Sequence, residues 1–154
     1  MKELQNELET EKEQEQKTKR IIIRVRNVMK HEFDIVDGRM TIMAALRTMK
    51  HVETKSLIVD KRDDDDEYGM LLISDIAKQV LALDRSPERI NVYEIMSKPL
   101  LSVDPEMDIR FSARLFDQFG LSRAPVLQDG KIIGIVSYTD MVLKGFLNYD
   151  DYVV

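Results

Sequence analysis

Cysteine is absent from this 154-residue chain, and histidine occurs only twice, at His31 and His51. Without cysteine the chain can form no disulfide, no thiolate metal site and no cysteine nucleophile. Neither histidine lies in a zinc-binding motif or beside a nucleophile elbow, so we interpret both as solvent-facing polar side chains. With no nucleophile–base pair, metal cluster or glycine-rich phosphate loop in the sequence, we expect no catalytic residues and no enzymatic activity.

Long apolar runs are also missing. The longest β-branched run, Ile21 to Ile23, ends at Arg24, whereas a membrane-spanning helix needs about 20 apolar residues. The first 20 residues lack the apolar region of a secretory signal, so we expect a cytoplasmic protein without a membrane partner. The formal net charge is −5, and the basic stretch from Lys17 to Lys30 carries no aromatic residue for base stacking. Nucleic acid is therefore not an expected partner.

From residue 21 onward the sequence repeats itself. Three blocks match at nearly constant spacing: Val25–Met29 with Val92–Met96 at 67 residues, Ser56–Val59 with Ala124–Leu127 at 68, and Gly69 and Asp75 with Gly134 and Asp140 at 65. The spacing changes only between predicted elements, where loops accept insertions. A duplicated structural unit follows from this pattern.

Each unit is predicted to run strand, helix, strand, strand, helix. In the first copy Ile42, Ala45, Leu46 and Met49 recur at helical spacing behind Thr41, a good N-cap residue. The second copy repeats that spacing from Ile109 to Phe116, with the cap and stop signals Asp108 and Gly120. Asp129-Gly130 predicts a two-residue hairpin, and the first copy has the acidic loop Asp63 to Glu67 in its place.

The repeat and the flanking composition divide the chain into five parts. Ser86-Pro87-Glu88 is a helix-start signal, which predicts a helix between the two copies. The parts are a charged N-terminal tail (1–20), a first repeat (21–84), a connecting helix (85–96), a second repeat (97–148) and a C-terminal tail (149–154).

Four motifs of the second copy carry a resemblance to a known family: Ile95-Met96, Val103-Asp104-Pro105, the run Gly120 to Val126, and the run Gly134 to Asp140. In this order and spacing they resemble the CBS domain, named after cystathionine β-synthase, and two in tandem resemble a Bateman module. The resemblance covers about residues 21–148. It implies an α+β fold of the α/β-type CBS class, in which two β-α-β-β-α repeats pack about a pseudo-twofold axis and leave two clefts.

The resemblance also implies a regulatory ligand. Such modules commonly bind AMP, ADP, ATP or S-adenosylmethionine, and NADH is a further candidate. An ionised carboxylate can accept hydrogen bonds from both ribose hydroxyls, and Asp140 matches the position with that role. Ser137 matches a hydroxyl that donates to phosphate or ribose, and Arg123 stands at a position that meets phosphate. Thr139, Pro125 and Ala124 complete the predicted site.

Local sequence alone supports another interpretation of these residues. Ser137, Thr139 and Asp140 precede a predicted helix, where such side chains ordinarily cap the first turn. Arg123 is equally compatible with a surface cation. The tandem pattern favours the ligand role for Asp140.

The first copy predicts a weaker second site, formed by Asp75, Ser74, Lys55 and Ser56. There Leu72 stands where the second copy has Ser137, and Lys55 replaces Arg123. Because the hydroxyl donor is lost, we expect a single bound nucleotide to lie at Asp140. The acidic loop fails the EF-hand pattern and is interpreted as solvated; Mg²⁺ is expected only as a counter-ion of a polyphosphate.

Three functions remain open at this point. The first is a nucleotide sensor that signals to a separate effector protein, with no required cofactor. The second is a dimerisation scaffold with degenerate, empty sites, and the third is an enzyme, for which the sequence offers the least support. A homodimer formed through the helices is what the resemblance implies.

Overall fold

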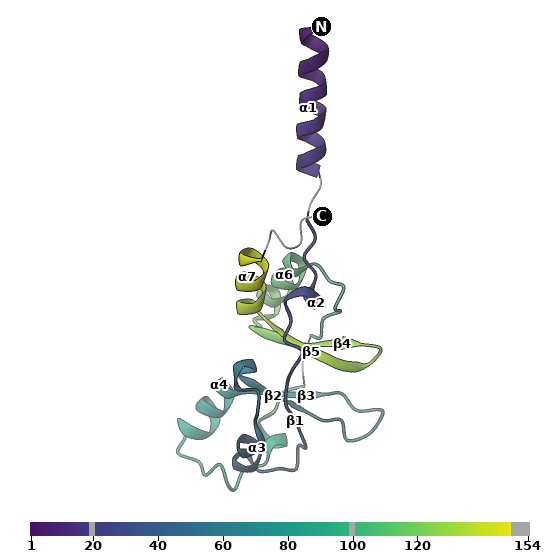
Figure 1. The fold of residues 1–154 in the computed structure, drawn as a ribbon. Coiled ribbons are helices and arrows are strands. Elements are labelled where there is room, and N and C mark those ends of the chain that lie inside the picture. The colour runs from purple at the N-terminus through teal and green to yellow at the C-terminus, as the bar shows by residue number, and fades with distance from the viewer. Residues whose placement is uncertain (19–20, 99–100, 149–154) are drawn as a thin grey trace.

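The computed structural model describes residues 1–18, 21–98 and 101–148, and it shows two lobes stacked one above the other (Figure 1). In the first lobe β1 (Ile35–Val36) pairs parallel with β2 (Ser56–Val59), which pairs antiparallel with β3 (Gly69–Leu72). Helix α3 (Ile42–Thr48) and the turn η1 (Val52–Thr54) join β1 to β2. Helix α4 (Ile73–Ile76) and the π-helical turn η2 (Ala77–Leu81) follow β3.

The second lobe repeats this order. Its sheet is the antiparallel hairpin of β4 (Arg123–Gln128) and β5 (Lys131–Ser137), preceded by α6 (Ile109–Phe119) and followed by α7 (Tyr138–Leu147). The first strand of this repeat is reduced to one parallel bridge between Val103 and Val126. The α+β class and the repeated order of elements are thus confirmed.

The predicted caps and the hairpin turn are present. The Thr41 hydroxyl accepts a hydrogen bond from the Ala44 amide at 3.1 Å, and Asp108 accepts one from the Arg110 amide at 2.9 Å. Gly120 ends α6 at φ 66°. Asp129 and Gly130 both have positive φ, as the turn type that best fits a twisted hairpin requires.

The connecting helix predicted for residues 85–96 is wrong: only α5 (Val92–Ile95) is α-helical there. The backbone of the chain before α5 forms hydrogen bonds to the first repeat instead of helical hydrogen bonds. The Ile90 carbonyl accepts from the Ile42 amide, the Pro87 carbonyl from Met43, and the Val92 amide donates to Met40. At the helix-start signal the chain forms only a turn, in which the Arg89 amide donates to the Ser86 carbonyl.

The two repeats exchange their leading segments. Residues 21–30, which contain α2 (Val25–Val28), pack in the core of the second repeat, and residues 90–96 pack in the core of the first. The hydrogen bonds are reciprocal, because Ile109 donates to Ile23 just as Ile42 donates to Ile90. These pairs are related as a twofold axis would relate them.

The segments after each short helix then reach the sheets. Lys30 forms an antiparallel bridge with Ile135, and Ser97 forms the corresponding bridge with Met70. A small cluster of buried apolar side chains, Ile58, Met70 and Ile135, lies between the two sheets. Lys30 and Ser97 are therefore equivalent positions of the two repeats.

Helix α1 (Lys2–Thr18) stands away from both lobes (Figure 1). The described side chains of residues 1–13 are exposed. Residues 19–20 of the predicted N-terminal tail and the whole C-terminal tail, 149–154, lie outside the described residues. Among the described helices, none combines the length and apolar character needed to cross a bilayer.

Candidate functional site

The start of α7 holds the carboxylate on which the predicted site depends. Ser137 is the N-cap residue, and its amide and hydroxyl donate to Asp140 Oδ2 at 3.1 and 2.9 Å. The Asp140 amide returns a hydrogen bond to the Ser137 hydroxyl at 3.2 Å. Asp140 is only 3% exposed. The capping interpretation is therefore correct for both residues, and it leaves Oδ1 for another partner.

That partner is Lys30, which belongs to none of the sequence motifs that predicted the site. Its Nζ lies 2.5 Å from Asp140 Oδ1, and Lys144 Nζ lies 3.8 Å from the same oxygen. Lys30 reaches this position because its backbone pairs with Ile135 in β5. A buried carboxylate needs such a cation, since an unpaired charge in a low-dielectric environment is costly.

Arg123 lies between the two repeats. From the first residue of β4 its Nη1 donates to the Thr54 carbonyl of η1 at 2.5 Å. Burial lowers the pKa of the Arg123 guanidinium, and the negative charge of Asp140 partly opposes that effect. The interpretation of Arg123 as a plain surface cation is wrong, because the side chain is half-buried and bonded across the repeat interface.

Two lysine side chains thus lie within 4 Å of one buried carboxylate, and the charge of Arg123 also interacts with it. Arg123 belongs to β4 and Lys144 to α7, whereas Lys30 lies in the segment between α2 and β1. Of the remaining predicted residues, Ala124 and Pro125 are buried in β4, whereas Thr139 is exposed on the first turn of α7. An anionic group would be attracted to this cluster.

The predicted second site is differently built. Asp75 is partly exposed, and no hydrogen bond or ion pair to its carboxylate occurs among the described residues. Ser74 and Lys55 are exposed, and Lys55 adopts a left-handed backbone at φ 54°. Ser56 is fully buried, and its hydroxyl donates to the Thr54 carbonyl at 3.1 Å. The four side chains thus differ in exposure, and no hydrogen bond or ion pair among the described residues joins the Asp75 carboxylate to the other three.

The repeat spacing explains the difference between the two sites. Leu72 takes the N-cap position of Ser137 and makes no side-chain cap, while Ser97 takes the place of Lys30. At the spacing of 65, Gln79 stands where the second repeat has Lys144. Neither lysine that pairs with Asp140 has a charged counterpart near Asp75.

The cavities of the described structure are small near these residues. One of about 100 Å³ lies beside Arg123 and Pro125 and is otherwise lined by residues such as Met70 and Leu72. Sites for drug-sized ligands typically measure about 300–1,000 Å³. A larger cavity of about 650 Å³ opens in the first repeat between Tyr93, Met96 and the acidic loop. A nucleotide at Asp140 would need the cleft there to widen.

The acidic loop is only partly solvated. Asp63 to Asp65 are exposed, but the Asp66 carboxylate pairs with Arg62 and with Lys98 of the inter-repeat segment, each at 3.0 Å. The hydrogen bonds from Arg62, with that from Lys98, hold the pKa of Asp66 well below its usual range. This loop is therefore attached through Lys98 to the segment that follows α5.

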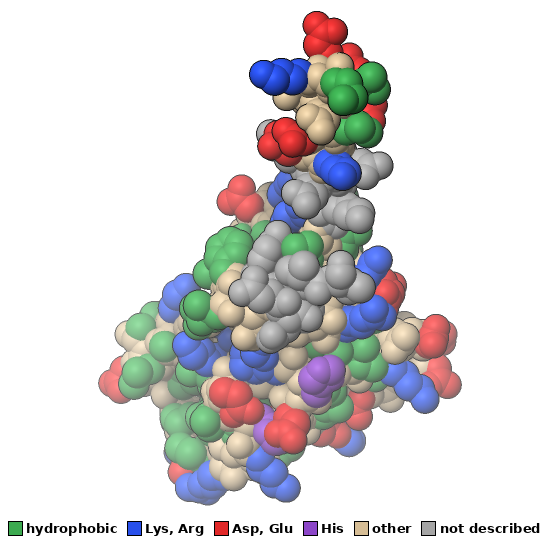
Figure 2. All heavy atoms as spheres, turned by 45° about the horizontal axis from the view of Figure 1, so that its top comes forward, with side chains coloured by type: hydrophobic (Ala, Val, Ile, Leu, Met, Phe, Trp, Pro, Cys, Tyr) green, Lys and Arg blue, Asp and Glu red, His purple; other side chains and the backbone are tan. Residues whose placement is uncertain are grey.

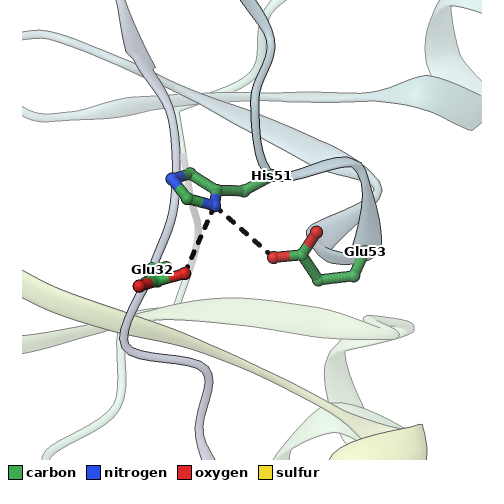
Figure 3. A group of neighbouring side chains, drawn as sticks. All are labelled: Glu32, His51 and Glu53. Carbon is green, nitrogen blue, oxygen red and sulfur yellow. Dashed lines mark ion pairs between the residues drawn. The ribbon is translucent and has the colours of Figure 1, made fainter.

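The interpretation of His51 as a merely solvent-facing residue is also incomplete. Its ring lies between the carboxylates of Glu32 and Glu53 (Figure 3), with Nδ1 3.6 Å from one oxygen of each. His31 is exposed, as expected. In the sequence only the spacing of His51 and Glu53 hints at this cluster, because Glu32 joins it through the fold.

The CBS domain profile matches residues 25–82 and 92–144, which together are more than half of the chain. This chain belongs to the CBS domain family. The match falls on the two repeats, so the protein contains a tandem CBS pair. The predicted family, drawn from the four motifs, is confirmed.

Three similar proteins illustrate the relationship. The hexameric CBS-CP12 protein from bloom-forming cyanobacteria is 34% identical, with 84% of this chain and 72% of that chain covered and a TM-score of 0.77. Uncharacterized protein MK0525 of Methanopyrus kandleri is 27% identical over 71% of this chain, which spans 57% of the length of that relative. The CBS pair of protein MJ0100, solved with 5′-methylthioadenosine and S-adenosyl-L-methionine, is 20% identical and shares the fold, with 84% of this chain and 98% of that chain covered and a TM-score of 0.65. None of these names describes an enzyme.

Proposed function

We propose that this CBS pair is a regulatory, non-catalytic module that senses an anionic adenosine nucleotide such as AMP, ADP or ATP at Asp140. The observation that carries the proposal is the buried carboxylate of Asp140, which interacts with the charges of two lysines and of Arg123. A carboxylate can accept both hydroxyls of a ribose, and the cations can meet its phosphates. The complex of MJ0100 supports adenosine ligands as a class that this fold accommodates.

Binding requires the ion pair between Lys30 and Asp140 to open. In our proposal the ribose hydroxyls take over Oδ1, and Lys30 turns to the phosphate, so both charges keep a partner. Lys30 lies on the segment that connects the core of the second repeat with β1 of the first. Its movement would shift one repeat against the other, which is how differential binding to two arrangements becomes a signal to an effector protein.

The test is a binding comparison between two matched variants. Calorimetry and thermal shift with AMP, ADP, ATP, S-adenosylmethionine and NADH should identify one ligand, which at about 100 times its Kd adds about 2.7 kcal/mol of stability. Asp140→Asn keeps the shape and the helix cap but loses charge-assisted hydrogen bonds worth about 1.5–3 kcal/mol each. We expect at least about tenfold weaker binding by Asp140→Asn, and unchanged binding by Asp75→Asn.

Equal loss of binding in the two variants would contradict the assignment of the site. No binding of any of the five compounds would favour the rival function, a scaffold with empty sites. Two observations support that rival: Lys30 already satisfies Asp140, and the cavity beside Arg123 is small.

We also propose that the module forms a homodimer and acts in the cytoplasm. Apolar side chains on the outer faces of α6 and α7 are exposed, among them Phe111, Val142 and Phe146. Figure 2 shows exposed hydrophobic side chains on the body, interspersed with charged ones. Light scattering on the samples used for calorimetry measures the mass, which for a dimer is twice 17.9 kDa.

A further inference from the structure

We infer that Glu32, His51 and Glu53 form a binding site for a divalent transition-metal ion of the zinc class. The three side chains each offer one ligand atom, and these atoms all lie within 4.8 Å of one another. The site is separate from the nucleotide proposal and does not require a nucleotide to be bound.

The distances fit a metal better than they fit direct hydrogen bonds. His51 Nδ1 lies 3.6 Å from Glu32 Oε2 and 3.6 Å from Glu53 Oε1. Hydrogen bonds of this type measure about 2.7–3.2 Å, so at 3.6 Å Nδ1 forms a full hydrogen bond with neither carboxylate. Two ligand atoms of a tetrahedral zinc ion, each about 2.0–2.1 Å from the metal, are about 3.3 Å apart. The two separations from His51 Nδ1 therefore need only a small closure around an ion, and the third, between the two carboxylate oxygens, is at most 4.8 Å.

The donor set selects the class of metal. One imidazole with two carboxylates suits zinc and related transition metals, whereas Ca²⁺ and Mg²⁺ prefer oxygen ligands alone. Three protein ligands leave a fourth tetrahedral position for water. The side chains of Glu32 and Glu53 are 79% and 52% exposed and that of His51 is 28% exposed, so an ion can reach the cluster from solution.

The backbone that carries the ligands is held in place by a buried side chain. Asp34 is 9% exposed, and its two oxygens accept from the Lys50 and His51 amides at 3.0 and 2.9 Å. The His51 carbonyl in turn accepts from the Thr54 hydroxyl at 2.9 Å. Asp34 thereby ties the segment that bears Glu32 to the turn that bears His51 and Glu53. Such support for the metal ligands reduces the conformational entropy that is lost when the metal orders them.

The position of the site gives the metal a structural consequence. Glu32 follows Lys30 by two residues, and Glu53 precedes Thr54, the carbonyl acceptor of Arg123. A bound ion would fix the segment that carries Lys30 and Glu32 against η1. We therefore expect Zn²⁺ to raise the melting temperature of the whole chain.

The experiment is a titration of chelator-treated full-length protein with Zn²⁺ alone. We expect one ion per chain and at least tenfold weaker binding by His51→Gln, Glu32→Gln and Glu53→Gln. His31→Gln and Glu88→Gln, at exposed positions outside the cluster, are the matched controls and should bind as the wild type does. Mg²⁺ at millimolar concentration should not displace the zinc.

A second measurement does not depend on any variant. The chain has two histidines, so the ring resonances of His51 and His31 can be followed separately in wild-type protein by NMR. Zinc should shift the His51 ring and leave the His31 ring unchanged. The site is refuted if the wild type binds no Zn²⁺, if His51→Gln binds it undiminished, if Mg²⁺ competes equally, or if the His31 ring alone responds.

Discussion

At the scale of single residues, Asp140 makes two structural interactions in addition to the ribose contact proposed for it. One oxygen caps α7 through Ser137, and the other is paired with Lys30. The side chain of Lys30 is 22% exposed and that of Asp140 is 4% exposed, so the pair is largely removed from water. Removing one partner of such a pair leaves the other with an uncompensated desolvation penalty.

Lys30→Met tests this pair. We expect the free energy of unfolding to fall by about 1–3 kcal/mol, because the Asp140 carboxylate loses its close cation. Urea denaturation followed by circular dichroism measures the change. The control is Lys144→Met: Nζ is 3.8 Å away and the side chain 42% exposed, so its effect should stay within about 0.5 kcal/mol.

A double variant decides whether the cost belongs to the pair. In an Asp140→Asn background Lys30→Met should cost clearly less than in the wild type, since no buried charge is left without a partner. An equal cost in both backgrounds would show that Lys30 stabilises the fold through its aliphatic chain instead.

Part of this site could be predicted from the sequence, and part could not. Ser137 and Asp140 carry a local signal, since a cap and its third following residue interact within one helical turn. Lys30 lies 110 residues before Asp140, and no local pattern relates them. Their contact depends on the exchange of the leading segments between repeats. For the same reason Glu32 could not be joined to His51 before the fold was known.

At the scale of elements, two equivalent glycines let the leading segments approach the sheets. A Cβ on Gly134 would lie 2.6 Å from the Lys30 carbonyl oxygen and 2.9 Å from Met29 Sδ. At Gly69 the nearest atoms would be Met96 Sδ at 2.8 Å and Val59 Cβ at 3.1 Å. The first clash includes backbone that is fixed by the bridge to Ile135, whereas the closest atom of the second is the flexible end of a methionine.

Gly134→Ala should therefore destabilise the protein by about 1–3 kcal/mol, the usual range for an overpacked core. Gly69→Ala should cost less, because the methionine can change its rotamer. Chemical denaturation of both variants gives the comparison. If Gly69→Ala proved the more harmful, the contact between residues 29–30 and β5 would be looser than the structure indicates.

The repeat predicted the elements well because each unit carries its own periodicity and caps. It failed at residues 85–96, where Ser86 and Pro87 have the local features of a helix start. The backbone there is used by the first repeat, through the bonds of Pro87 and Ile90 to α3. Tertiary pairing outweighs local propensity at this point, and a single sequence holds no signal of that competition.

At the scale of the whole molecule, the exchange of segments makes each repeat depend on residues outside its own unit. The core of the second repeat contains Ile23, Val25, Val28 and Met29, all at most 6% exposed. The core of the first contains Ile90, Val92 and Ile95. The two lobes should therefore unfold together, in a single transition.

Two truncations separate this interdependence from the contribution of α1. A chain that lacks residues 1–18 should keep its stability within about 0.5 kcal/mol, because α1 stands apart and its described side chains are exposed. A chain that begins at residue 31 loses four buried side chains, each worth about 1.5–3 kcal/mol, and that sum approaches the whole stability of a typical domain. Circular dichroism with tyrosine fluorescence should show no cooperative transition for the shorter chain. A persistent transition with an unchanged midpoint would mean that residues 97–148 fold without the segment that the first repeat supplies.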